Sequence, residues 1–207
     1  MGPRAVFTRE QIIEGGVDLI RTQGADTLSV RNVAAHIGSS TQPLYRLFGS
    51  SEAFEHELCR HVMEMMLDTM MTTHDAASSF LGIGIGFLTF AKAEPNLFRF
   101  LFFSGRRSAG ALFDGIMSDA LRGKMREDHM LCGFDDAVLE RLLRDMALYS
   151  LGIAAEICFE KDTGSMEEYR KMLEETGGRL MIAEYCMRHP HTTYHEIGRK
   201  KNEHHGM

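Results

Sequence analysis

Apolar residues recur at helical spacing along most of the chain, beginning near its N-terminus. Ile13, Val17 and Ile20 lie four and three positions apart, which is the pattern of an amphipathic helix. Thr8 stands before this run and a glutamine follows it three residues later, a capping-box signature for a helix start. Gly24 comes after the run and is typical of a helix end. The pattern therefore predicts a first helix between Thr8 and Gly24.

Two shorter helices are predicted in the rest of the first 50 residues. The segment VRNVAAHI follows Ser29, a good N-cap, and Gly38 ends it. A third helix is expected to be capped by Ser39 or Ser40, with Pro43 in its first turn, where the missing N–H costs little. Two short helices joined by a tight turn with glycine form the helix-turn-helix pattern, and the second of them is in the position that reads DNA.

The periodicity stays helical beyond residue 50. The run SEAFEHELCRHVMEMMLDTMM contains five of the 15 methionines. The next segment includes GIGIGF, whose alternation also fits a strand, but Phe80, Ile83, Phe87 and Phe90 recur at spacings of 3, 4 and 3, which favours a helix. Two long helices are expected at residues 135–160 and from 165, with a second capping box, to just before Pro190.

These elements predict an all-α protein without internal repeats or a convincing strand pair. We expect an N-terminal helix-turn-helix domain over residues 1–50 and a larger helical domain over residues 51–190. The last residues, 191–207, carry four of the ten histidines. Histidine clusters can bind metal, but no cysteine or regularly spaced acid accompanies these, so we interpret the segment as a flexible tail without a metal site.

Composition and charge narrow the functional classes. The net charge of −6 by itself speaks against a nucleic-acid binder, but residues 1–50 carry five arginines and four acids and the acidity lies in the rest. The four cysteines are far apart, which fits reduced thiols in a cytoplasmic protein. The longest nearly apolar run, FLGIGIGFLTFA, is too short to span a bilayer. We find no secretory signal and expect no membrane association.

The N-terminal segment resembles the TetR family of transcriptional regulators. The resemblance covers about residues 8–56, and its specific part is the spacing of seven residues: Gly38, Ser40, Leu44, Tyr45, Phe48, Ser50 and Glu52. The remainder is similar to the family only in its helical style and length. Two positions depart from the family pattern, since Leu47 stands where histidine is usual and Ser51 where lysine is usual. That lysine normally reaches a DNA phosphate. The departures therefore predict weaker binding to the DNA phosphate backbone.

The resemblance implies which residues contact DNA. Gln can pair with adenine, Thr or Pro can touch a thymine methyl group, and Arg can read guanine or hold a phosphate. The alternative for Tyr45 is a place in the core, for Ser40 a purely capping role, and for Arg31 a solvated side chain. The implied set is Ser29, Arg31, Ser39, Ser40, Thr41, Gln42, Pro43, Tyr45 and Arg46.

The larger domain offers candidates for a small-molecule site and for a dimer surface. Methionine adapts to irregular ligands, although a place in the core is the favoured reading for these methionines and phenylalanines. The ligand candidates are Met63, Met66, Met70, Phe87, Phe98 and Phe102. The last two helices pair in the resembled family to form a four-helix bundle with a second subunit. The interface candidates are Leu151, Ala155, Tyr169, Met172, Leu173, Thr176, Leu180 and Ala183.

Together these features predict a homodimeric repressor that binds a palindromic DNA operator and is released by a small-molecule effector. One alternative keeps the fold as a small-molecule sensor with weak or non-specific DNA binding. The other is an α-helical enzyme, but the chain has no G-x-S-x-G, H-E-x-x-H or P-loop motif. We therefore expect no catalytic residues, no metal and no cofactor. The sequence identifies neither effector nor operator, and it does not separate repressor from activator.

Overall fold

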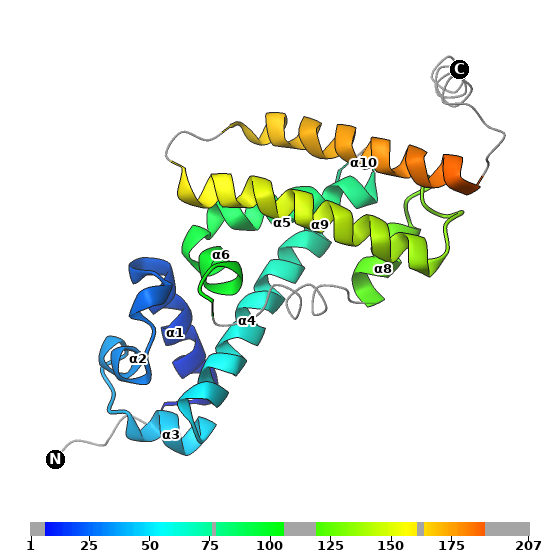
Figure 1. The fold of residues 1–207 in the computed structure, drawn as a ribbon. Helices are drawn as coiled ribbons and strands as arrows, with labels where there is room; N and C mark the ends of the chain where they lie inside the picture. Colours follow the sequence, from blue (N-terminus) through cyan, green and yellow to red (C-terminus); the bar gives the residue numbers. More distant parts are fainter. Residues whose placement is uncertain (1–6, 76–77, 106–118, 161–163, 189–207) are drawn as a thin grey trace.

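The computed structural model describes residues 7–75, 78–105, 119–160 and 164–188. Within these ranges all regular elements are helical, and the prediction of an all-α fold is confirmed (Figure 1). In chain order the elements are α1 Arg9–Gln23, a 3₁₀ turn η1 at Ala25–Thr27, α2 Val30–His36, α3 Gln42–Phe48, α4 Ser51–Thr72, α5 Ser79–Ala93, α6 Pro95–Phe102, α8 Asp119–Arg126, α9 Asp136–Phe159 and α10 Met166–Arg188.

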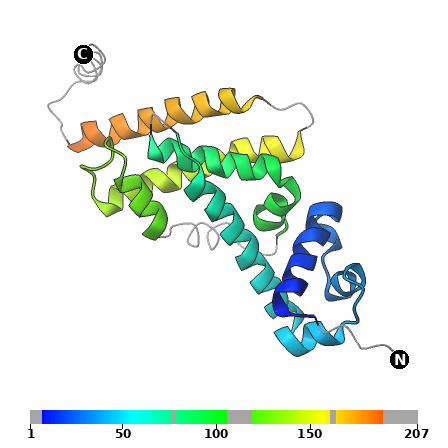
Figure 2. The same cartoon turned by 180° about the vertical axis from the view of Figure 1, so that it is seen from behind.

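Helices α1–α3 form a small group at one end of the molecule, and α4 runs from this group into a larger helical layer (Figures 1 and 2). α5 and α9 lie within that layer, with α10 along its outer edge. A contact between α1 and α6 also joins the two groups. Arg21 forms a two-pronged ion pair with Glu94 at 2.9 Å, and Asn96 donates from Nδ2 to the carbonyl oxygen of Arg21 at 2.8 Å. The small group is therefore held to the larger one through both α4 and α6.

Several helix ends follow the predicted capping chemistry. Thr8 and Gln11 exchange two side-chain hydrogen bonds with each other's backbone N–H, and Gly24 ends α1 with a positive φ of 87°. Ser165 and Glu168 form the second capping box at the start of α10. Both predicted boxes are confirmed.

The predicted cap of the third helix is wrong. α3 begins at Gln42, its N-cap is Thr41, and no side chain accepts a hydrogen bond there. The N–H of Ser39 donates to the carbonyl oxygen of Ala34 at 2.8 Å, so Ser39 belongs to the end of α2. Gly38, with φ of 68°, turns the chain at this point. The turn therefore uses one more residue than the sequence pattern indicated.

The glycine-rich segment is a helix, as the aromatic spacing predicted. Phe80, Ile83, Phe87 and Phe90 of α5 are all buried. The glycines admit α4 at close range, because a methyl group at Gly86 would lie 2.6 Å from the Cα of Met70. This face of α5 therefore allows close approach of another helix.

Two buried charged side chains, one on α8 and one just after it, form hydrogen bonds with the end of α4 and the start of α5. Lys124, only 5% exposed, donates from Nζ to the carbonyl oxygens of Met70, Met71 and Thr73 at 2.7–2.8 Å, where α4 ends. Asp128 accepts hydrogen bonds from Ser78 and from the N–H of Phe80, where α5 begins. A cation at a helix C-terminus and an anion at a helix N-terminus are each favourable. The α8 segment therefore stabilises both the C-terminus of α4 and the N-terminus of α5.

Candidate nucleic-acid interface

The face of α3 away from the core exposes polar side chains. Leu44 and Phe48 are 1% and 7% exposed, and α3 packs against α4, where Phe48 contacts Phe54 edge to face. Gln42, Tyr45 and Arg46 are exposed on the other side. Tyr45 has half of its surface accessible, so its alternative reading as a core residue is excluded. A short helix with a buried apolar face and an exposed polar face is suited to insert the polar face into a DNA groove.

The remaining predicted contacts lie around α3 and at the start of α2. The Ser29 hydroxyl accepts a hydrogen bond from the N–H of Asn32 at 3.1 Å and so caps α2. Arg31 in the first turn of α2 and Ser40 in the turn before α3 are exposed, whereas Ser39, Thr41 and Pro43 are partly buried. The structure thus brings all nine predicted residues to α2, α3 and their connecting turn. Whether they contact DNA stays a prediction.

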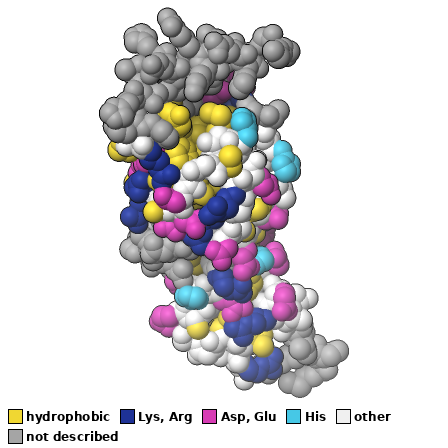
Figure 3. Space-filling view, turned by 90° about the vertical axis from the view of Figure 1, so that its right-hand side faces the viewer, with side chains coloured by type: hydrophobic (Ala, Val, Ile, Leu, Met, Phe, Trp, Pro, Cys, Tyr) yellow, Lys and Arg dark blue, Asp and Glu magenta, His cyan; other side chains and the backbone are white. Residues whose placement is uncertain are grey.

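The arginines of the N-terminal group fall into two classes. Arg9 and Arg21 pair with Glu57 and Glu94 of the helices behind them. Arg31 and Arg46 form no salt bridge with an acid among the residues that the structure describes. The space-filling view shows arginines and acids alternating down this narrow end of the molecule (Figure 3). Among the described arginines of this group, the two left for an external anion therefore lie on α2 and α3.

The two departures from the family pattern have different surroundings. Leu47 is partly buried and packs against the core, and its carbonyl oxygen accepts a hydrogen bond from Arg9 at 2.7 Å. Ser51 is the first residue of α4, next to the capping hydroxyl of Ser50. A lysine at position 51 would begin the helix immediately after the recognition helix, which is where the family pattern places its cation.

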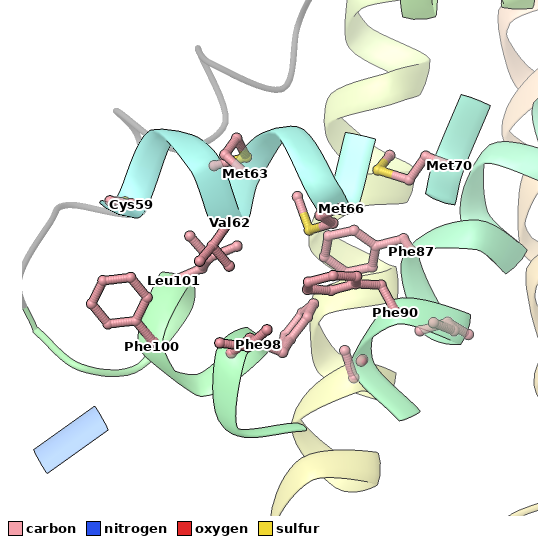
Figure 4. Close-up of a cluster of buried hydrophobic side chains, with 14 of the residues drawn as sticks. Cys59, Val62, Met63, Met66, Met70, Phe87, Phe90, Phe98, Phe100 and Leu101 are labelled. Atoms are coloured by element: carbon pink, nitrogen blue, oxygen red, sulfur yellow. The ribbon is translucent and has the colours of Figure 1, made fainter. Parts of the chain in front are cut away.

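The predicted ligand residues gather where α4, α5 and α6 meet. Phe87 and Phe98 contact each other edge to face at a centroid distance of 5.1 Å, and Phe98 lies 4.6 Å from Phe102. Figure 4 shows Met66 and Met70 of α4 above the rings of Phe87 and Phe98. Met63, Met66, Met70, Phe87 and Phe98 are buried, and Phe102 is half-buried. They form part of the packed core, so a role in effector binding stays a prediction.

The aromatic cluster continues from this core to the surface. Phe103 is 40% exposed and contacts Phe159 of α9 edge to face at 5.2 Å. The guanidinium of Arg99 lies 5.5 Å from the centre of the Phe159 ring. Beneath them burial raises the pKa of the Cys158 thiol to about 11, so this cysteine is protonated at neutral pH. Neither Phe103 nor Phe159 was among the residues predicted to bind a ligand.

The residues predicted for the dimer surface differ in their exposure within the single chain. Tyr169 and Leu173 are 2% and 1% exposed, so their side chains lie in the chain's own core. The Tyr169 hydroxyl donates to Glu156 at 3.0 Å, and Leu173 packs over Gly84 of α5. The other six residues are at least partly exposed: Leu151, Ala155, Met172, Thr176, Leu180 and Ala183.

The outer side of α9 and α10 carries further exposed apolar residues. Leu148 and Phe159 are 54% and 55% exposed, and with Leu151 and Ala155 they follow helical spacing along α9. Met187 of α10 is 67% exposed. Leu148 and Phe159 share helical spacing with the predicted residues Leu151 and Ala155. This spacing is the sequence signal that could have identified them.

Other site types find no support among the described ranges. Within them no three histidine, cysteine or acidic side chains come together as metal ligands do. None of the described helices combines the length and apolar character needed to cross a bilayer.

No known protein-family model and no curated protein sequence matches the chain. Solved structures do match. A TetR-family transcriptional regulator from Streptomyces coelicolor has a TM-score of 0.65 at 18% identity, over 86% of this chain and 84% of that one. A possible TetR family transcriptional regulator from Streptomyces coelicolor A3(2) has 0.59 at 18% identity, over 87% and 100%. The TetR family repressor AlkX from Dietzia sp. strain DQ12-45-1b has 0.52 at 18% identity, over 86% and 97%. The helix-turn-helix group, the long connecting helix and the outer helical layer thus together have the fold of TetR-family transcriptional regulators.

Proposed function

We propose that the protein is a homodimeric transcriptional repressor that binds a palindromic DNA operator and is released by a small-molecule effector. The observation that carries the proposal is the outer face of α2 and α3. There Gln42, Tyr45 and Arg46 are exposed, and Arg31 and Arg46 lack an acidic partner among the described residues. The solved structure described as a repressor gives the mode of action that we adopt.

A second copy of the chain would supply the symmetry that a palindrome requires. Exposed apolar residues on α9 and α10, such as Leu148 and Met187, give a surface that a partner subunit can cover. In a dimer the two α3 helices would have to match major grooves about 34–36 Å apart. An effector that favours a different separation would release the operator by population shift.

The effector is proposed to bind where the aromatic cluster of α5, α6 and α9 reaches the surface. Phe102, Phe103 and Phe159 offer ring faces, and Arg99 provides a cation beside them. This environment suits an apolar or aromatic small molecule. The junction of α6 with α1 through Glu94 and Arg21 then gives a direct route from that site to the DNA-binding group.

Genomic footprinting with the purified protein tests the DNA-binding part. A discrete palindrome supports the proposal, and diffuse protection would support the alternative of weak, non-specific binding. Tyr45→Phe tests the residue assignment, because it removes one hydroxyl from an exposed ring and keeps the packing. We expect affinity to fall by about 0.5–1.5 kcal/mol, equally for every DNA sequence, since phosphate contacts carry no base information. A loss confined to one operator position would contradict the phosphate role.

A further inference from the structure

The C-terminal end of α3 is fastened by one side chain from α1. The guanidinium of Arg9 donates from Nη1 to the carbonyl oxygen of Leu47 at 2.7 Å. It also donates from Nε to Oε1 of Glu57 at 2.6 Å and from Nη2 to the second oxygen of that carboxylate. Its carbon Cζ lies 4.6 Å from the centre of the Phe48 ring. One side chain thus joins the start of α1, the end of α3 and the second turn of α4.

We propose that Arg9 and Glu57 are positioning residues for DNA binding, which hold α3 at the angle its outer face needs to read base edges. This inference rests on the proposed function and adds a role for two residues that lie outside the helix-turn-helix contact set. Neither belongs to the outer face of α3, so they act through that helix.

Helix α3 depends on such support because its other anchors are few. It has seven residues and no side-chain cap at its N-terminus. Leu44 and Phe48 bury its inner face and Leu47 is partly buried, so its apolar anchors all lie within about one and a half turns at its C-terminal end. The last carbonyl groups of a helix lack partners within the helix and carry partial negative charge. A guanidinium at Leu47 therefore satisfies one of these groups and complements the charge at that end.

Glu57 sets the direction in which Arg9 points. Carboxylate and guanidinium meet in a two-pronged arrangement, which fixes both the plane and the position of the guanidinium. Hydrogen bonds from Arg9 lower the pKa of the Glu57 carboxyl, so this acid stays ionised at neutral pH. Because Glu57 belongs to α4, the angle of α3 is tied to the helix that enters the larger domain. A shift of α4 would be passed to α3 through this pair.

The alternative is that Arg9 itself holds a DNA phosphate, and the two roles give opposite results for Glu57. If Arg9 held a phosphate, Glu57→Gln would remove a competing anion and strengthen DNA binding. If Arg9 positions α3, Glu57→Gln releases the guanidinium and weakens sequence-specific binding. Arg9→Gln weakens binding in both cases, but loss of a phosphate contact in a dimer would also flatten the salt dependence of log affinity by roughly 2 units.

The experiment compares wild type, Arg9→Gln, Glu57→Gln and the double variant on an operator fragment and on random DNA across a salt series. We expect each single variant to lose about tenfold in operator affinity, comparable to one base contact, with random DNA affected less than about twofold. The double variant should match the single ones, because both act through one arrangement. Arg60→Lys is the matched control, since Arg60 forms an exposed ion pair with Glu64 on the same helix α4.

Other results would overturn the proposal. Stronger binding by Glu57→Gln, or equal losses on operator and random DNA, would show that Arg9 does not act by orienting α3. Thermal melting of each variant separates these results from unfolding, and Arg9→Lys, which keeps the charge but loses the two-pronged geometry, gives a conservative second test. A wild-type protein that protects no discrete DNA site would instead refute the proposed function.

Discussion

We expect Gly86→Ala to force α4 and α5 apart and to destabilise the protein. A methyl group at this position would lie 2.6 Å from the Cα of Met70 and 2.9 Å from the carbonyl oxygen of Thr69. Both atoms belong to the backbone of α4, so no change of rotamer relieves the overlap. The helices have to separate by about 1 Å to restore ordinary contact distances.

The magnitude follows from two opposing terms. Overpacking costs about 1–3 kcal/mol, and a clash with backbone places Gly86→Ala at the upper end of that range. Alanine recovers about 1 kcal/mol of helix propensity relative to glycine. The expected net loss in the free energy of unfolding is therefore about 2 kcal/mol, which for a chain of 207 residues lowers Tm by roughly 4–8 °C.

Thermal and urea unfolding, followed by circular dichroism at one protein concentration, measures this change. Gly123→Ala in α8 is the control, because a methyl group there would meet no atom within 4 Å. It should stabilise the protein by up to about 1 kcal/mol through propensity alone. If Gly86→Ala were as stable as Gly123→Ala, the crossing of α4 and α5 would be looser than the structure shows and the reasoning would fail.

Three further predictions concern other parts of the fold. Lys124→Met should lower the free energy of unfolding by about 2 kcal/mol, because buried carbonyl groups at the end of α4 lose their donor; an unchanged urea midpoint would contradict this. Alkylation followed by mass spectrometry at pH 7.5 should label the exposed Cys132 long before Cys158, whose pKa is raised to about 11 by burial; equal rates would show that α9 opens readily. Leu148→Glu should yield monomer in sedimentation, because it places a charge on the exposed apolar face of α9; a persistent dimer would exclude that face as the interface.

Local patterns in the sequence were sufficient to locate most helices. The aromatic spacing of 3, 4 and 3 identified α5 despite its alternating glycines, and the capping residues Thr8 and Ser165 marked the starts of α1 and α10. These signals involve residues within one or two turns of each other, so they need no knowledge of the rest of the fold. The helix-turn-helix arrangement and its exposed residues at Gln42 and Arg46 followed from the same local information.

The partners of each helix were decided only by the tertiary structure. Periodicity placed Tyr169 and Leu173 on one stripe with Met172, yet the first two turn into the chain's own core and the third faces outward. No local sequence feature distinguishes the buried residues from the exposed one. Periodicity indicates which residues share a helix face, but it does not indicate which neighbouring element covers that face. The same holds for Arg9, whose partner Glu57 lies 48 residues away and whose role depends on three helices meeting at one point.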